Sequence, residues 1–354
     1  MAVSRSLIAP TSNPLLERSL LEKLQLRAGT AGRLGELEPL AVRLGLMQNT
    51  LKPRFRDPQI VLFAADHGLA VDGVAEAGRA GTAEQVANLL AGRLPLAVFA
   101  RIQQIGLTVV DAGVADNLPA HERLLMRKIA HGTRNARLST AMTLEQAHAA
   151  MRAGMEIGDT LRGNLLICAG LGVGSELSAA LVLSRLTDSS VRELLVSGPQ
   201  MDADVLAHLM VVAQGAQGRH REVVEPVEVL AAFGGLEIAM MVGVMLVAAS
   251  KRHLLLIDGM AACAALMLAS RIATPVTDYC VFCRSHGRRG LDRALYLFRA
   301  SALLELGMDA ADGTGATLAW PLVRSAAALL TEVADGDDPG PSQPMAIDSA
   351  AARG

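Results

Sequence analysis

The chain has 354 residues, of which 51% are hydrophobic and only 3% aromatic, so we expect an aliphatic core in one large domain or two of ordinary size. The formal net charge is −2 and the pI is about 6.5, which argues against a nucleic-acid partner. No apolar run is long enough for a membrane span, and residues 1–7 lack the apolar stretch of a secretory signal. The four cysteines lie among apolar residues. We therefore expect a reduced, cytoplasmic protein without a membrane partner.

Residues 1–48 are predicted to form a helical subdomain. Two sets of apolar residues recur at spacings near helical, and Gly29–Gly32 separates them. We expect the two helices to pack on the main body or on a partner subunit. The first set is Leu15, Leu16, Leu20, Leu21, Leu24 and Leu26, and the second is Leu34, Leu37, Leu40, Ala41 and Leu44.

Residues 49–336 are interpreted as a second domain, in which short apolar runs alternate with helical segments. The runs, each typical of a buried parallel strand, lie at 59–65, 107–114, 164–169 and 254–258. Helices are predicted at 82–101, 144–161, 202–214, 227–249, 261–273 and 317–330, and a further apolar segment lies at 191–196. This alternation indicates an α/β fold, a Rossmann-like parallel sheet flanked by helices, beside the small helical subdomain. The tail at 337–354, rich in Asp, Pro, Gly and Ser, is predicted to be disordered.

Polar residues and glycines gather at the ends of the predicted strands. Each group alone is explained by turn chemistry. In a parallel sheet, however, the carboxyl ends of the strands lie on one edge, and ligands bind there. The four groups together therefore predict a binding site. They are Asp66-His67-Gly68, Asp111-Ala-Gly113, Gly170 to Ser175, and Asp258-Gly259.

The segment Gly170-Leu-Gly-Val-Gly-Ser-Glu follows a predicted strand and opens a helix, the context of a phosphate-binding turn. The glycine spacing is not that of a full dinucleotide fingerprint, and no ribose-binding acid follows a later strand. We therefore favour a phosphate site, with Gly172, Gly174 and Ser175 at the ligand, over an NAD site.

A second glycine turn, Asp312-Gly-Thr-Gly-Ala, precedes the predicted helix 317–330. Backbone N–H groups of Gly313, Thr314 and Gly315 would face an anion, and Asp312 at the edge could take a proton from a reacting group. The alternative is that Asp312 is only a helix cap. Glu176 stands six residues beyond Gly170 inside a predicted helix, so we do not expect it to substitute for Asp312.

Three other features have simpler interpretations. His67 has no partner at metal spacing, and we prefer a hydrogen-bonded structural histidine. Cys280 and Cys283 have the spacing of half a zinc site, but no second pair matches them, so we prefer packed core thiols. Arg284, with two neighbouring arginines, is either a solvated basic face or a source of charge for a phosphate. No metal site is expected.

The order of motifs from about residue 14 to 335 resembles the nicotinate-nucleotide:dimethylbenzimidazole phosphoribosyltransferases of cobalamin lower-ligand assembly. The motifs are Ala65-Asp-His-Gly-Leu with Asp72-Gly-Val74, Val109-Val-Asp-Ala-Gly-Val114, Gly132-Thr-Arg-Asn135 with Ala141-Met-Thr143, Phe233-Gly-Gly-Leu-Glu-Ile-Ala-Met-Met241, Ile257-Asp-Gly259, and Asp312-Gly-Thr-Gly-Ala316 with Ala319-Trp-Pro321.

The resemblance implies a reaction and a set of site residues. A benzimidazole nitrogen attacks the ribose C1′ of nicotinate mononucleotide and displaces nicotinate, without a metal or cofactor. Asp312 would accept the proton. The implied substrate-binding residues are Asp66, His67, Glu84, Gly172, Gly174, Ser175, Gly198, Asp258, Gly313, Thr314 and Gly315. A homodimer is expected from the same resemblance.

Several positions depart from the family pattern. The usual glutamate is Asp312 here, the loop glutamate is Gly170, and Ser175-Glu176-Leu177 replaces Asn-Thr-Thr. Loss of the loop glutamate and of a lysine, which is Leu209 here, favours an alternative, a catalytically weakened homologue that binds nucleotide or base, for example as one subunit of a heterodimer. The remaining departures are Gly198-Pro-Gln-Met-Asp-Ala203 for a phosphate loop, Leu209 for a lysine, Glu84 for a glutamine and Gly29-Thr30 for Lys-Pro. An unrelated dinucleotide-dependent oxidoreductase is the second alternative.

Overall fold

A computed structural model of the chain describes residues 8–75, 78–195, 201–285, 289–308, 310 and 312–333. Gly198 and the tail predicted at 337–354 lie outside the described residues. The described residues fall into two compact units. The larger comprises residues 8–12 and Phe55–Leu322, and the smaller comprises Asn13–Arg54 and residues 323–333. No helix in the described part of the chain has the length and apolarity needed to cross a membrane.

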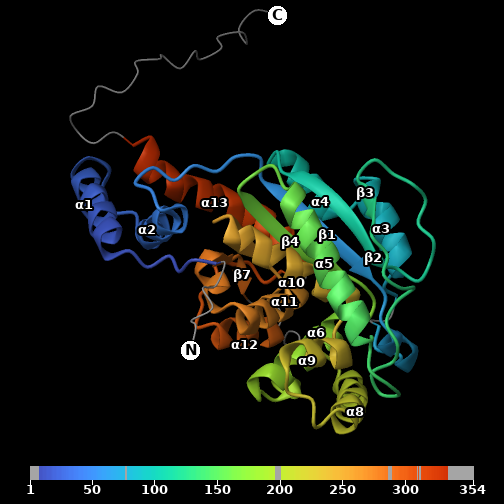
Figure 1. The fold of residues 1–354 in the computed structure, drawn as a ribbon. Helices are drawn as coiled ribbons and strands as arrows, with labels where there is room; N and C mark the ends of the chain where they lie inside the picture. Colours follow the sequence, from blue (N-terminus) through green and yellow to red (C-terminus); the bar gives the residue numbers. More distant parts are fainter. Residues whose placement is uncertain are drawn as a thin grey trace, which may run out of the picture. The chain divides into compact units, whose positions relative to one another are not determined.

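The larger unit contains a six-stranded sheet in which every pair of neighbouring strands is parallel, as predicted (Figure 1). Its order is β3-β2-β1-β4-β5-β6. In β1 every residue after Gln59 is buried, and in β4 every residue is buried. Successive side chains of a strand point to opposite faces, so both faces are covered. The strands are β1 (Gln59–Ala65), β2 (Gly106–Gly113), β3 (Leu124–Met126), β4 (Leu165–Leu171), β5 (Leu254–Ile257) and β6 (Cys280–Phe282).

Two of the predicted helices are each broken in two. The helix predicted at 82–101 is α3 (Thr82–Leu90) and α4 (Pro95–Ile102), because Gly92 has a φ of 74° and Pro95 starts a new helix. The helix predicted at 227–249 is α9 (Pro226–Phe233) and α10 (Leu236–Ser250), separated by Gly234 and Gly235 in extended conformations. The other helices of this unit are α5 (Leu144–Thr160), α6 (Ser175–Thr187), α7 (Val191–Leu195), α8 (Ala203–Arg219), α11 (Met260–Ile272) and α12 (Arg289–Leu297).

The structure also contains short elements that were not predicted from the sequence. They are the strands β3 and β6, a small second sheet made of β7 (Arg284–Ser285) and β8 (Leu304–Glu305), helix α12, and the 3₁₀ turns Gly68–Asp72 and Thr274–Tyr279. Strands of two or three residues carry too little periodicity to be predicted from sequence. The small sheet contains Arg284, whose side chain forms an ion pair with Asp258.

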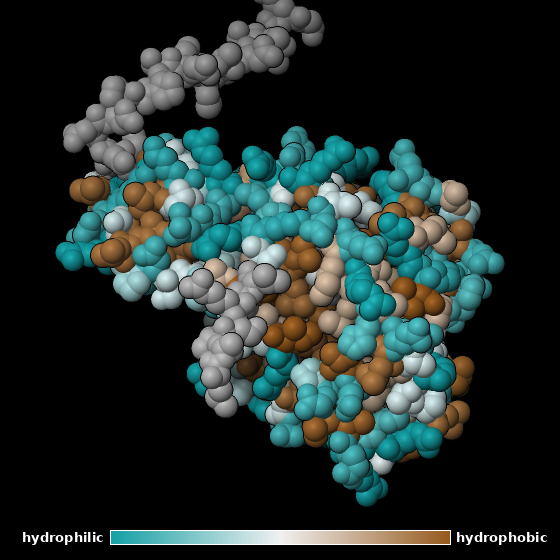
Figure 2. Space-filling view, viewed as in Figure 1, coloured by the Kyte–Doolittle hydropathy of each residue, from teal (hydrophilic) through white to brown (hydrophobic). Residues whose placement is uncertain are grey.

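The smaller unit contains the two helices predicted from the leucine pattern, α1 (Pro14–Ala31) and α2 (Leu37–Gln48). Leu20 is fully buried, and its side chain lies against Gly45 of α2. Leu15, Leu21 and Leu26 of α1 are exposed, and Figure 2 shows apolar side chains at the surface of this helix. The helix α13 (Thr314–Thr331) begins in the larger unit and continues into the smaller one.

Candidate active site

The topology places the predicted site at the point where the strand order reverses. From β1 the chain proceeds to β2 and β3 on one side, whereas β5 and β6 follow β4 on the other side. Because β1 and β4 are neighbours, the crevice at their carboxyl ends is the position where ligands bind in open parallel sheets. His67 follows β1 and the Gly170 turn ends β4, so the structure brings these predicted residues together.

The glycine turn lies tightly against the end of β1. A Cβ atom built on Gly172 would lie 1.9 Å from the carbonyl oxygen of Ala65, so this position requires a glycine for close backbone approach. Gly174 has a φ of 88° and precedes the first residue of α6. Two N–H groups of the turn have partners within the protein. Val173 donates to Thr82 Oγ1 at 3.0 Å, and Ser175 donates to the Gly172 carbonyl at 3.2 Å.

Asp66 is connected to this turn by hydrogen bonds through the Thr82 hydroxyl. Its carboxylate accepts hydrogen bonds from the Thr82 hydroxyl and from the N–H of Ala115, the latter at 2.8 Å. Thr82 in turn holds the Val173 N–H. Asp66 therefore links the ends of β1 and β2 to the glycine turn. Glu84, one of the predicted binding residues, is exposed on α3, and it is not among the described residues that line the cavity identified below.

His67 is a buried, hydrogen-bonded histidine, as preferred from the sequence, and its partner is a residue that sequence reasoning missed. Glu237, at the start of α10, is fully buried and its Oε1 lies 2.8 Å from His67 Nε2 and 2.8 Å from Ser175 Oγ. One carboxylate thus connects the end of β1 to the start of α6. The signal in the sequence was a single charged residue within the otherwise uncharged segment 236–250.

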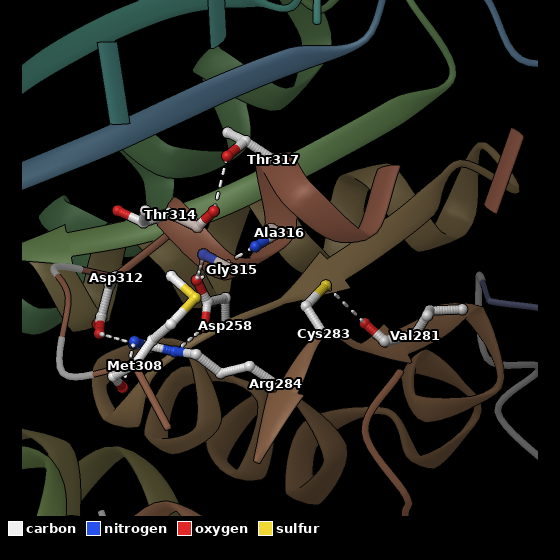
Figure 3. A network of polar contacts seen from close by, with 10 residues as sticks. All are labelled: Asp258, Val281, Cys283, Arg284, Met308, Asp312, Thr314, Gly315, Ala316 and Thr317. Atoms are coloured by element: carbon white, nitrogen blue, oxygen red, sulfur yellow. Dashed lines mark hydrogen bonds and ion pairs between the residues drawn. The ribbon is translucent and has the colours of Figure 1, made fainter. Parts of the chain in front are cut away.

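Asp258, at the end of β5, organises the second glycine turn (Figure 3). The carboxylate is 1% exposed. Its Oδ2 accepts from the N–H groups of Gly315 at 2.7 Å and Ala316 at 3.3 Å, and its Oδ1 accepts from Arg284 Nε at 2.7 Å. The N–H groups of Gly315 and Ala316 are therefore directed to Asp258 in this structure. A buried carboxylate here satisfies helix-start donors that would otherwise lack partners.

Asp312 is held beside two glycines. A Cβ built on Gly259 would lie 1.8 Å from Asp312 Oδ1, and one built on Gly170 would lie 3.8 Å from Oδ2. A side chain at Gly259 would clash with the carboxylate, whereas a Cβ at Gly170 would be in ordinary van der Waals contact with it. Arg284 Nη2 lies 3.9 Å from Asp312 Oδ1, and the Asp312 side chain is 20% exposed. The carboxylate is thus partly accessible at the ends of β4 and β5.

One cavity adjoins both glycine turns. Asp312 and Ser175 both line it, so the two turns predicted from the sequence share one cavity. Glu176 lines it as well, because α6 begins at Ser175 and its first turn faces the cavity. Glu176 therefore lies at the site although it stands six residues beyond Gly170 in the sequence. The lining residues are Arg79, Gly170, Leu171, Gly172, Ser175, Glu176, Met260, Ala261, Ala310 and Asp312.

The four cysteines are free and buried, which confirms the interpretation of Cys280 and Cys283 as packed thiols. Burial raises the pKa of the Cys283 thiol well above its usual range. Burial also raises the pKa of Cys263, and the nearby carboxylates of Asp312 and Asp258 raise it further. These thiols are therefore neutral and unreactive near pH 7.

The parallel sheet brings two glycine turns and the carboxylates of Asp312 and Glu176 to one cavity, an arrangement suited to an enzyme that binds a phosphorylated ligand. Residues 9–340 match a family model described as phosphoribosyltransferase. A nicotinate-nucleotide–dimethylbenzimidazole phosphoribosyltransferase of Cupriavidus taiwanensis is 42% identical over 91% of this chain and 92% of its own length. The corresponding protein of Janthinobacterium sp. is 37% identical over 95% and 98%. The chain belongs to the nicotinate-nucleotide–dimethylbenzimidazole phosphoribosyltransferase family, which confirms the resemblance seen in the sequence.

A solved structure agrees with this assignment. The crystal structure of the nicotinate-nucleotide–dimethylbenzimidazole phosphoribosyltransferase from Thermus thermophilus aligns with a TM-score of 0.84 at 30% identity, covering 90% of this chain and 96% of that one. A second structure from the same organism, named CobT, gives a TM-score of 0.81.

Proposed function

We propose that this protein transfers the phosphoribosyl group of nicotinate mononucleotide to 5,6-dimethylbenzimidazole, giving α-ribazole 5′-phosphate and nicotinate for the lower ligand of cobalamin. Family membership supports the reaction. The observation that carries the assignment to this site is that Asp312 and the Gly172–Ser175 turn line one cavity at the reversal point of the sheet.

In the proposed reaction, the unprotonated nitrogen of the base attacks C1′ of the ribose. The bond from C1′ to the nicotinate nitrogen breaks, and its electron pair returns to the pyridine ring, which leaves as nicotinate. The N–H of the attacking base becomes acidic as the new bond forms, and Asp312 takes this proton. The transition state resembles an oxocarbenium ion, so positioning and charge placement supply most of the rate.

The proposed binding residues divide into two groups. Gly172 and Ser175 line the cavity and would form the wall for the phosphate, with Gly174 shaping the turn between them, and Arg79 on the same cavity would add positive charge. Asp66, His67 and Asp258 hold the turns in place through Thr82, Glu237 and the start of α13. We retain Gly313, Thr314 and Gly315 as the turn that presents Asp312, and Glu84 and Gly198 as the remaining candidates.

The test is incubation of the purified protein with nicotinate mononucleotide and 5,6-dimethylbenzimidazole, with purines and phenols as competing acceptors, read by mass spectrometry. We expect nicotinate and one ribotide product in equal amounts. Asp312→Asn keeps the shape but cannot take the proton, so turnover should fall on the order of a hundredfold or more while nucleotide affinity stays within about threefold. Binding without turnover in the wild type would favour the alternative, a homologue that binds the nucleotide but lacks activity, to which Gly170 beside Asp312 lends support.

We also propose a homodimer in which α1 contributes to the interface. Leu15, Leu21 and Leu26 of this helix are all exposed, Leu15 by 82% and Leu26 by 71%, so α1 offers apolar side chains for a partner subunit to cover. Light scattering should give the mass of two chains for the wild type and of one chain for Leu15→Glu/Leu26→Glu. A monomeric wild type would refute the proposal.

A further inference from the structure

Arg284 is a buried cation whose guanidinium is fixed on two sides. Nε donates to Asp258 Oδ1 at 2.7 Å and Nη1 donates to the carbonyl of Met308 at 3.2 Å, and the residue is only 3% exposed (Figure 3). Because the guanidinium is planar and rigid, fixing Nε and Nη1 also fixes the direction of Nη2. Nη2 lies toward Asp312 Oδ1 at 3.9 Å.

The two oxygens of Asp312 consequently have different surroundings. Oδ1 lies above Gly259 and faces Arg284, whereas Oδ2 lies toward Gly170, which lines the cavity. Oδ2 is therefore the oxygen nearer to this part of the cavity wall. In the sequence Arg284 stood out only as part of a basic cluster, with phosphate binding as one role, but its Nε and Nη1 are already bonded within the protein.

We propose that Arg284 is a positioning residue for the proton transfer: it holds Asp312 ionised and oriented so that Oδ2 accepts the proton from the attacking base. This inference rests on the proposed function. Asp258 orients Arg284 and holds the N–H groups of Gly315 and Ala316, so one buried carboxylate aligns both the arginine and the start of α13. The small sheet β7–β8 supports this position, because Arg284 enters the site from the strand that follows β6.

Other charged or titratable groups also lie near Asp312. Asp258 is a carboxylate already bonded to three donors. Cys263 on α11 has a pKa raised by burial and is uncharged. Glu176 of α6 and Arg79 line the same cavity as Asp312. Arg284 is a buried cation, and its Nη2 lies 3.9 Å from Asp312 Oδ1.

The experiment is the pH dependence of kcat for the wild type, Arg284→Gln and Arg284→Lys, with the KM for nicotinate mononucleotide measured at each pH. The acid limb of kcat reports protonation of the base in the enzyme–substrate complex. Loss of a cation beside a carboxylate moves such a limb by about 1 pH unit or more, so Arg284→Gln should shift it upward by that amount. Its plateau kcat should fall about tenfold while KM stays within about threefold.

Arg284→Lys keeps the charge but loses the planar fork. It should hold the acid limb within about 0.5 unit of the wild type and lose about tenfold in kcat. If Arg284→Gln does not fold, Arg284→Lys alone tests whether Arg284 positions Asp312. An unchanged kcat in Arg284→Lys would overturn the proposal. An active wild type with an unmoved limb in Arg284→Gln would refute this inference and leave the proposed function intact. An inactive wild type would instead refute the proposed function.

Discussion

Asp258→Asn tests how much the second glycine turn depends on one buried charge. The carboxylate accepts from Arg284 Nε, from the Gly315 N–H and, at 3.3 Å, from the Ala316 N–H. Asparagine has the same size but only one acceptor oxygen. Whichever way the amide is turned, its NH₂ group faces a donor, either the guanidinium or the N–H groups at the start of α13.

The expected loss follows from these contacts. A hydrogen bond to a charged group contributes about 1.5–3 kcal/mol, and removal of one partner from a buried ion pair costs about 3–5 kcal/mol. Asparagine keeps one of the two interactions, so we expect the free energy of unfolding to fall by about 3 kcal/mol. Asp202→Asn is the matched control. Asp202 is exposed and caps α8 at 2.7 Å from the Asp204 N–H, where Asn and Asp are about equally good caps.

Urea unfolding at pH 7, followed by circular dichroism, measures both variants. Asp202→Asn should remain within about 0.5 kcal/mol of the wild type. If Asp258→Asn lost no more than this control, the buried ion pair would carry no stability, and Asp258 could not be the anchor that orients Arg284.

Two further predictions concern backbone space and pH. Gly172→Ala should lower the free energy of unfolding by several kcal/mol, because its Cβ would lie 1.9 Å from the Ala65 carbonyl oxygen. Gly218 is exposed in α8, and Gly218→Ala should raise the free energy of unfolding by about 0.5–1 kcal/mol. Urea unfolding compares the two variants. Burial, and then the nearby Lys251, lower the pKa of His253 below its ordinary value, so the unfolded chain binds the proton first and stability falls as the pH drops below about 6.5. The His253→Gln variant should therefore lose less in Tm than the wild type between pH 7.5 and 5.5, and an equal loss would contradict the assignment.

The fold was predictable because buried parallel strands are continuous apolar runs that sequence alone makes visible. The segment predicted at 59–65 is β1 with the same bounds, and the other three predicted strands are β2, β4 and β5 within one or two residues. Helix breaks were missed although Gly92, Pro95 and Gly234-Gly235 signalled them, because the apolar pattern continued through each break. Apolar periodicity reports burial, and burial does not require an unbroken helix.

The site was predictable only in part, since sequence motifs reveal glycine turns but not the side chains that support them. Asp312 and the Gly172–Ser175 turn do share a cavity. The roles of Glu237 and Arg284 depend on contacts across 170 and 26 positions of the chain, which spacing cannot show. Glu176 was set aside because of its distance from Gly170 along the chain, but the start of α6 turns it into the cavity.

The last prediction concerns Gly170, where the family pattern usually has glutamate. A Cβ at this position would lie 2.6 Å from Ala261 Cβ, an atom fixed on α11, and 3.3 Å from the Met241 methyl group. Gly170→Ala introduces this clash alone and should destabilise the protein by about 1–3 kcal/mol. Gly170→Glu adds a carboxylate close to Asp312 Oδ2, which lies 3.8 Å from the Cβ position.

Two carboxylates this close cannot both ionise freely, so one pKa of the pair must rise. Gly170→Glu should therefore lower kcat below that of Gly170→Ala near pH 7, because less of Asp312 is ionised. Ala261→Gly removes the steric clash but not the repulsion, so Gly170→Glu/Ala261→Gly should recover stability, measured by urea unfolding, without recovering kcat. If Gly170→Glu alone were as stable as the wild type and turned over faster, the family glutamate would fit without repacking. Absence of that glutamate would then explain any weak activity of this protein. If Gly170→Glu were instead less stable and slower than the wild type, the site of this protein would require glycine at 170 beside Asp312 and Ala261. The shorter carboxylate of Asp312 would then go together with the absence of a side chain at 170.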